Sequence, residues 1–193
     1  TDAQGDWSNA AFWLAAAKDT HKITLNGLSL SSQPDRRVLE LLSDMGMKIE
    51  LHGDSVCASA PEQTHGILFD ASGIPDLVPI LCVRAAVSKG ATVISGTHRL
   101  RLKESDRVQA VCRMLEALGG KVRADEDHIY IEGCERLHGG TVDSFNDHRI
   151  AMSFAVAGTI CDGTVDILNG ECVNISYPEF YHDLYSLDSS RQK

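Results

Sequence analysis

The feature that most constrains the fold is an internal repeat with a period of about 70 residues. Three times, a short polar or turn segment precedes an apolar stretch of helical length. The polar segments are Gly5-Asp6-Trp7-Ser8, Gly73-Ile74-Pro75-Asp76 and Asn146-Asp147-His148-Arg149, and the apolar stretches are residues 9–17, 77–87 and 150–160. Since each repeat of this length is one recurring supersecondary unit, the period decides the architecture before any single helix or strand does.

Each apolar stretch leads into a strand and then into a second helix. The predicted strands are residues 22–25, 91–95 and 164–168, and the second helices begin near Asp35, Ser105 and Pro178. Gly46 and Gly119 suit the ends of the first two of these helices. In the middle copy a hairpin follows, with strands 121–124 and 128–132. The unit is therefore strand, helix, strand, helix, strand, strand.

The three copies span approximately residues 1–60, 66–133 and 140–187, and only the middle copy is complete. The first copy lacks its leading strand, and the third ends after its second helix without a closing hairpin. We therefore expect open sheet edges that other chain segments complete. The first residue is Thr1 rather than Met, which favours a part of a longer protein.

The first helix of each copy is apolar on nearly all sides, which is typical of a helix with no solvent-facing side. We expect these three helices to lie parallel inside a single globule of residues 1–193, with three sheets wrapped around them. The predicted fold class is α/β, a pseudo-threefold arrangement of such units around buried parallel helices.

The composition narrows the range of partners. Lys and Arg total 18 against 27 Asp and Glu, a formal net charge of −9, which disfavours nucleic acid as a partner. No apolar run approaches the roughly 18 residues of a membrane span, so no membrane partner is expected. The six cysteines form no Cys-x-x-Cys pair and the eight histidines no metal-binding spacing. This pattern predicts buried free thiols in a reducing cytoplasm, no metal site and no cofactor.

The most specific polar stretch is residues 99–107, Arg-Leu-Arg-Leu-Lys-Glu-Ser-Asp-Arg, which runs from a loop into an amphipathic helix. One interpretation is purely structural, because Ser105 can cap the helix, Asp106 suits its first turn, and the remaining charges can face solvent. The other interpretation is a local basic cluster that holds an anionic small substrate against the overall negative charge.

Two further stretches stand at the mouths of apolar helices. Residues 146–149 (Asn-Asp-His-Arg) put basic side chains where they oppose the helix macrodipole, which an anion bound to free backbone N–H groups would explain. A capped helix with a partly buried His148 is the alternative. Residues 74–76 (Ile-Pro-Asp) put Asp76 at another mouth, where aspartate is more often a cap than a base. If the repeats share an axis, Asp76 and His148 lie on one rim.

Together, the Ile-Pro-Asp, Lys-Glu-Ser-Asp-Arg and Asn-Asp-His-Arg motifs, with their spacing, resemble the signature of the 5-enolpyruvylshikimate-3-phosphate (EPSP) synthases, or 3-phosphoshikimate 1-carboxyvinyltransferases. The resemblance extends from Gly5 to Phe180. In this enolpyruvyl transferase family a full chain holds two globules, each an inside-out α/β barrel. The resemblance implies that this chain is the second, C-terminal globule, and that the first segment of the polypeptide crosses over to complete it.

The resemblance also implies a reaction, in which the enolpyruvyl group of phosphoenolpyruvate is transferred to the 5-hydroxyl of shikimate 3-phosphate and phosphate is released. The implied catalytic residues are Asp76 and Glu104, and the implied substrate-binding residues are Lys103, Arg107, His148 and Arg149. Asp76 would act as base on the hydroxyl, Glu104 would carry the proton of the methylene group, and the two arginines would hold phosphoenolpyruvate. The missing N-terminal domain would supply many contacts to shikimate 3-phosphate, so the chain alone is expected to be inactive.

Two positions depart from the family pattern. Ile175 stands where many members carry a lysine, and Arg99 stands where some carry an asparagine. Two alternatives therefore stay open: the corresponding half of an enolpyruvyl transferase that acts on UDP-N-acetylglucosamine, and a non-catalytic module that only binds an anion.

Overall fold

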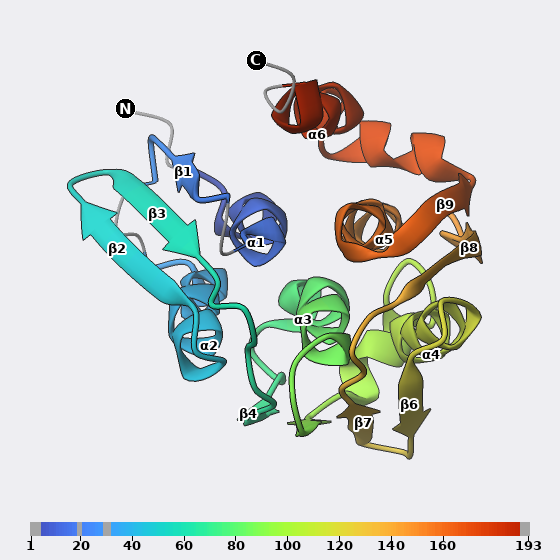
Figure 1. The fold of residues 1–193 in the computed structure, drawn as a ribbon. Helices are drawn as coiled ribbons and strands as arrows, with labels where there is room; N and C mark the ends of the chain where they lie inside the picture. The colour runs from blue at the N-terminus through green and yellow to red at the C-terminus, as the bar shows by residue number, and fades with distance from the viewer. Residues whose placement is uncertain (1–4, 19–20, 29–31, 190–193) are drawn as a thin grey trace.

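The computed structural model describes residues 5–18, 21–28 and 32–189, with three parallel helices at its centre (Figure 1). These are α1 (Trp7–Ala16, blue), α3 (Val78–Ala86, green) and α5 (His148–Ile160, orange). All nine residues of α3 are buried, as are most of those in α1 and α5. Helices without a polar side are stable only when other elements enclose them, so these three form the interior.

The four-stranded sheet is the complete copy of the repeat. It comprises β4 (Leu68–Asp70), β5 (Ala91–Ser95), β6 (Lys121–Ala124) and β7 (His128–Glu132), in the order β4-β5-β7-β6. β4 and β5 are parallel because α3 crosses over between them, whereas β7 runs antiparallel to both of its neighbours.

The other two sheets repeat parts of this order. In the first copy β1 (Ile23–Leu25), β3 (Ser55–Ser59) and β2 (Lys48–His52) correspond to β5, β7 and β6; in the third, β8 (His138–Asp143) and β9 (Asp162–Leu168) correspond to β4 and β5. Among the described residues, β1 pairs only with β3 and β9 only with β8, so each leaves one edge open. The predicted α/β fold with incomplete first and third copies is confirmed, although within this part of the chain the sheets do not join into a closed barrel.

The second helix of each copy lies farther out (Figure 1). These helices are α2 (Val38–Asp44), α4 (Arg107–Ala117) and α6 (Phe180–Ser189), and the short 3-10 turns are η1 (Pro34–Arg37), η2 (Pro75–Leu77), η3 (His98–Leu102) and η4 (Gly170–Ile175). As expected, α2 and α4 are followed by glycines with positive φ, 90° at Gly46 and 80° at Gly119.

Helices α1 and α5 each begin two residues earlier than predicted. Their N-caps are aspartates, since the Asp6 carboxylate accepts from the backbone N–H groups of Ser8 and Asn9, and the Asp147 carboxylate accepts from that of Arg149. An aspartate cap satisfies N–H groups that the first turn leaves unpaired, which draws the helix start toward the cap.

The C-terminal ends of the three central helices meet at the opposite end from these caps, where two cations contact main-chain carbonyl groups. Lys18 donates to the carbonyl of Thr159 in the last turn of α5, and Arg84 Nη1 donates to that of Ala17 at 3.3 Å. Cations suit the negative end of a helix. Arg84 is nevertheless only 6% exposed, and burial lowers its pKa to about 10.

The six cysteines are unpaired; Cys82 and Cys172 are buried and the other four are half-buried. The expectation of buried thiols therefore holds for two of the six. In the described ranges no helix combines the length and the hydropathy needed to cross a lipid bilayer.

Candidate functional site

The N-terminal ends of α3, α4 and α5 bring the three polar motifs into one contact network. Asp76 lies in η2 at the mouth of α3, Glu104 lies in the loop before α4, and Arg107 is the first residue of α4. Side chains from all three helix starts are joined by hydrogen bonds and ion pairs of 2.7–3.7 Å. The parallel packing of α3 and α5 places their starts at one rim, and α4, which packs against both of them, brings Arg107 to the same rim.

Arg107 is the centre of this network. Its side chain is 1% exposed, and all of its nitrogen atoms donate to carboxylates. Nε donates to Asp147 Oδ2 at 2.8 Å, Nη1 to Asp76 Oδ1 at 2.7 Å and Nη2 to Glu104 Oε2 at 2.7 Å. Burial lowers the pKa of Arg107, but the hydrogen bonds and charges of Asp147 and Asp76 raise it by more than burial lowers it. The pKa of Arg107 therefore lies above its ordinary value.

Arg149 is held differently, although it is also buried, at 8% exposure. Its Nη1 donates to the side-chain amide oxygen of Asn9 at 3.1 Å, and its guanidinium lies 5.8 Å from the ring centre of Phe12. The nearest carboxylate oxygen is that of Asp76, 3.7 Å from Nη2. Nε has no hydrogen-bond partner in the described part of the molecule.

Asp76 is shared between three cations. Lys103 Nζ lies 3.3 Å from its Oδ1, in addition to the contacts from Arg107 and Arg149. Burial raises the pKa of Asp76, but the hydrogen bond and charge of Arg107 and the charges of the other two cations outweigh it, so the pKa lies below the ordinary value of 3.8. The carboxylate is therefore ionised at neutral pH and a weak base in this arrangement.

His148, the first residue of α5, is 7% exposed. Burial, aided by the positive charge of Arg149, holds the pKa of His148 below its ordinary value of 6.5, so the imidazole is neutral at pH 7. Its Nδ1 atom is buried and makes no hydrogen bond within the described residues. A neutral ring with an unused nitrogen can serve as a donor or an acceptor toward a ligand.

The sequence interpretation did not identify Asp147 as a residue of the site. Its side chain is 0% exposed and contacts both side chains of the network and the first turn of α5. It accepts two hydrogen bonds from Arg107, one from Ser105 Oγ at 3.0 Å and one from the backbone N–H of Arg149. Ser105, the cap in the purely structural interpretation of residues 99–107, does not cap the helix: Asp106 caps α4 by accepting from Gln109 N, and the Ser105 hydroxyl donates to Asp147.

The backbone before Asp147 adopts an uncommon conformation. Phe145 and Asn146 have φ values of 52° and 57°, in the left-handed region that costs a non-glycine residue roughly 1–2 kcal/mol. Two side chains stabilise this turn, since Asp143 accepts from Phe145 N at 2.8 Å and Ser144 accepts from Asn146 N at 3.2 Å. Strained backbone of this kind persists where the surrounding structure holds a side chain in a fixed orientation. Here the turn precedes Asp147, whose side chain points into the molecule.

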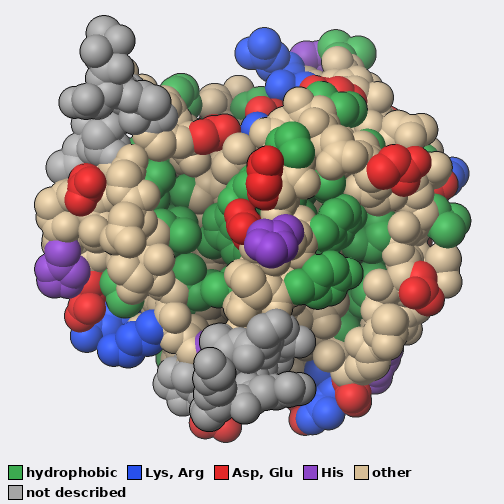
Figure 2. Space-filling model, turned by 90° about the horizontal axis from the view of Figure 1, so that it is seen from above, with side chains coloured by type: hydrophobic (Ala, Val, Ile, Leu, Met, Phe, Trp, Pro, Cys, Tyr) green, Lys and Arg blue, Asp and Glu red, His purple; other side chains and the backbone are tan. Residues whose placement is uncertain are grey.

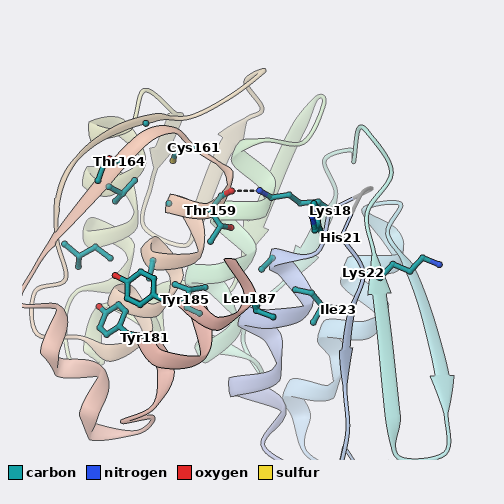
Figure 3. Close-up of a pocket in the computed structure, with 17 residues that line it drawn as sticks. Lys18, His21, Lys22, Ile23, Thr159, Cys161, Thr164, Tyr181, Tyr185 and Leu187 are labelled. Carbon is teal, nitrogen blue, oxygen red and sulfur yellow. Dashed lines mark hydrogen bonds between the residues drawn. The ribbon is translucent and has the colours of Figure 1, made fainter. Parts of the chain in front are cut away.

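A separate hollow lies between the open edges of β1 and β9. Figure 2 shows hydrophobic side chains gathered within this face, which is the upper side of the view in Figure 1. The cavity measures about 540 Å³, and its walls include Ile23, Val165 and Ile167 from the two strands and Leu184 from α6. Figure 3 shows Lys18 at its border, bonded to Thr159. None of the residues of the polar network lines this cavity.

Among the residues that the structure describes, no three His, Cys, Asp or Glu side chains come together in a way that could hold a metal ion.

Comparison with known proteins agrees with the motifs. The family model described as EPSP synthase (3-phosphoshikimate 1-carboxyvinyltransferase) matches residues 2–184. A 3-phosphoshikimate 1-carboxyvinyltransferase from Clostridium acetobutylicum is 47% identical over 185 residues, which cover 95% of this chain and 42% of that protein. The chain thus spans less than half the length of this relative.

Solved structures give the same result for the fold. An EPSP synthase from Acinetobacter baumannii has a TM-score of 0.82 and 30% identity, over 95% of this chain and 46% of the other. The enolpyruvyl transferase NikO from Streptomyces tendae has a TM-score of 0.77 over 95% of this chain and 43% of its own, but at 21% identity it supports the fold alone. From the extent of the family match and these identities, the chain belongs to the EPSP synthase family.

Proposed function

We propose that this chain is the C-terminal globule of a 3-phosphoshikimate 1-carboxyvinyltransferase and holds the phosphoenolpyruvate side of its active site. The single observation that carries the proposal is the convergence of two buried arginines, Arg107 and Arg149, with two carboxylates, Asp76 and Glu104, at one rim of helix mouths. The names of the relatives support the same reaction. The proposed location is the cytoplasm, since free cysteines are typical of a reducing compartment.

Two buried atoms favour an anionic ligand at this rim. Arg149 Nε and His148 Nδ1 lack partners among the described residues, although a buried polar atom without a hydrogen bond costs about 1–3 kcal/mol. The N-terminal ends of α3 and α5 point to the same rim, and their dipoles add positive potential there. Phosphate or carboxylate oxygens of phosphoenolpyruvate would supply the missing acceptor for Arg149.

Phosphoenolpyruvate would compete with Asp76 and Glu104 for Arg107. Asp147 is fully buried, so it would keep Nε, while the half-exposed Asp76 and the more exposed Glu104 would release Nη1 and Nη2 to the anion. Once Nη1 and Nη2 of Arg107 donate to the substrate, the hydrogen bond that lowers the pKa of Asp76 is lost and the anion offsets the charge of Arg107. The carboxylate then becomes a better proton acceptor, as a general base requires.

The proposed chemistry then uses both released carboxyl groups. Asp76 removes the proton of the 5-hydroxyl of shikimate 3-phosphate as that oxygen bonds to the central carbon of phosphoenolpyruvate, and Glu104, acting in its protonated form, delivers a proton to the methylene carbon. When the tetrahedral adduct collapses, phosphate departs with the proton that Asp76 holds, and the methyl group returns a proton to Glu104 so that the double bond reforms. Lys103 and His148 would bind substrate oxygens beside this centre.

The other half of the active site would come from the part of the enzyme that this chain does not include, since the chain covers 42% of a relative's length. In the complete copy of the repeat, β7 pairs with β5, and the equivalent edge of β9 is open in the third copy. We propose that a segment of the missing N-terminal part occupies the apolar hollow between β1 and β9, and that the N-terminal domain closes over the rim. Closure excludes water and brings the groups that bind shikimate 3-phosphate, so the 193-residue chain alone should not turn over.

Calorimetry with phosphoenolpyruvate tests the half-site. Wild type, Arg149→Gln and the matched control Arg123→Gln are compared, since Arg123 is an exposed arginine that stacks on Tyr130 away from the rim. We expect the control to bind like wild type and Arg149→Gln to lose about tenfold or more in affinity, as loss of one charge-assisted contact implies. Equal affinities in all three proteins would refute the site.

A phosphate-release assay tests the reaction. We expect no turnover from the chain alone, and turnover with shikimate 3-phosphate when the chain is joined to an N-terminal part from a relative. Release with UDP-N-acetylglucosamine instead would identify the related transferase. Binding without turnover in the joined protein would favour a non-catalytic anion-binding module.

A further inference from the structure

The first turn of α1 also lies at the rim, so that all three central helices start there, and the backbone of this turn is held firmly. The Asp6 carboxylate accepts from Ser8 N at 2.9 Å and from Asn9 N at 3.3 Å. The Ser8 hydroxyl donates to Asp35, which ties this turn to η1. Asn9 is therefore presented from a rigid support, and its half-buried side chain points to another helix.

That side chain contacts Arg149. The guanidinium group of arginine has only donors, so the amide oxygen of Asn9 must face it, and it accepts from Nη1 at 3.1 Å. Phe12, one turn farther along α1, lies beside the same guanidinium at 5.8 Å. Helix α1 thus fixes the position of Arg149 by one hydrogen bond and one ring contact, and Nε remains without a partner in the described structure.

The two arginines of the rim differ in their partners. Arg107 donates to three carboxylates at hydrogen-bonding distance, whereas the hydrogen-bond acceptor of Arg149 is a neutral amide. Asp76 is 3.7 Å away from Arg149, and the nearby Asp35 is bound to Ser8 rather than to the guanidinium. An amide orients a cation without cancelling its charge, while a carboxylate does both.

We propose that Asn9 is a positioning residue that holds Arg149 in place while leaving its positive charge for the substrate anion. This inference rests on the proposed function, because it assumes that Arg149 binds an anion. It assigns a role in anion recognition to the one helix mouth that none of the sequence motifs identified as part of the site.

Replacement of Asn9 by aspartate separates orientation from charge. Asn9→Asp keeps an oxygen acceptor and adds a negative charge in the first turn of α1, where aspartate favours the helix, so the fold should be retained. A carboxylate at the place of the Asn9 amide would offset the positive charge of Arg149 at close range, so anion binding should weaken by about tenfold or more. Asn9→Ala should lose less, because the charge of Arg149 remains.

The test titrates inorganic phosphate and phosphoenolpyruvate into the 193-residue chain by calorimetry. Asn26→Asp is the control, since Asn26 also accepts a side-chain hydrogen bond, from Ser55 at 2.8 Å, but is exposed and away from the network. We expect the affinity order wild type and Asn26→Asp, then Asn9→Ala, then Asn9→Asp. The NMR signal of the Arg149 Nε–H group reports orientation independently of binding, and it should stay distinct in Asn9→Asp and broaden or average in Asn9→Ala.

The outcomes distinguish this inference from the proposed function. If Arg149→Gln binds both anions as wild type does, the anion site itself is refuted. If Arg149→Gln loses affinity while Asn9→Asp matches wild type, the role of Asn9 is refuted and the site stands. If Asn9→Asp does not fold, Asn9→Ser replaces it, with an unchanged Arg149 signal and unchanged affinity counting against the role.

Discussion

Replacing Asp147 by asparagine tests whether the rim depends on a buried ion pair. In wild type the carboxylate is fully buried and accepts from Arg107 Nε at 2.8 Å and from Nη2 at 3.3 Å. Asparagine has nearly the same shape and is as good a helix cap as aspartate, so the start of α5 should be preserved. The substitution therefore removes the charge opposite Arg107 and replaces one of the two acceptor oxygens by an NH2 group, which cannot accept from the guanidinium.

The expected loss of stability follows from burial. Removing one member of a buried ion pair costs about 3–5 kcal/mol, because the remaining charge stays desolvated. Arg107 keeps Asp76 and Glu104 as partners, so we expect the lower end, about 3 kcal/mol. For a domain of this size, each kcal/mol lowers Tm by roughly 2–4 °C, which predicts a decrease of about 6–12 °C.

Urea unfolding followed by tryptophan fluorescence measures this loss. The chain has two tryptophans, Trp7 and Trp13, which are 0% and 7% exposed, so their emission reports on the core. The control is Asp106→Asn, which also alters an N-cap but breaks only a half-exposed pair with Arg101 and should cost less than about 1 kcal/mol. Equal unfolding free energies for the two variants, with unchanged denaturant slopes, would refute the reasoning.

Three other substitutions give separate tests. Burial raises the pKa of Asp76, but Arg107 lowers it more, so the pKa in the folded protein lies below the ordinary value of 3.8. The ionised Asp76 therefore stabilises the fold fully above that ordinary value, and this stabilisation is lost as the pH falls through the folded pKa. Asp76→Asn should therefore flatten the acid side of a urea-midpoint series, and an unchanged slope would contradict this. Arg84 donates to the Ala17 carbonyl but is otherwise unpaired in the described region, and burial lowers its pKa to about 10. Arg84→Met should raise the unfolding free energy by about 1–2 kcal/mol, because the gain from removing a buried charge exceeds the loss of one hydrogen bond. An unfolding free energy below that of wild type would contradict this. Ile175 stands at the position where the family pattern predicts a lysine and is 72% exposed, so Ile175→Lys should fold normally and bind phosphoenolpyruvate more tightly in calorimetry; unchanged affinity would place this residue outside the site.

The repeat and the hydropathy of its helices were sufficient to predict most of the fold. A helix that is apolar all round has only one stable environment, so the burial of α3 and α5 could be inferred without coordinates. The order of strands and helices followed from the period, including the missing hairpin of the third copy. Helix starts were less predictable, because capping depends on which of several adjacent polar side chains turns back to the backbone, as Asp106 does rather than Ser105.

The candidate site was predictable only in part, for a related reason. The motifs marked the loops that are proposed to carry the chemistry, and the repeat indicated that their helix starts lie near one another, as the contacts of Arg107 with Asp76 and Glu104 show. The inward turn of Asp147 depends on two left-handed residues before it, which local sequence preferences do not reveal. The contact of Asn9 with α5 joins residues 140 positions apart, and only the equivalence of the three helix mouths could have drawn attention to it.

The partners of the two arginines indicate how binding and proton transfer would be coupled if the proposed function holds. Arg107 can bind an anion only by giving up Asp76 and Glu104, and these are the two carboxylates that the reaction needs. Arg149 needs to give up no hydrogen-bonded carboxylate, so it offers the first contact to an approaching anion. Because Asp147 keeps Arg107 in place throughout, the exchange changes the partners of the guanidinium without moving it. Asp76 would thus gain proton affinity only after the substrate has arrived, which confines its action as a base to the occupied site.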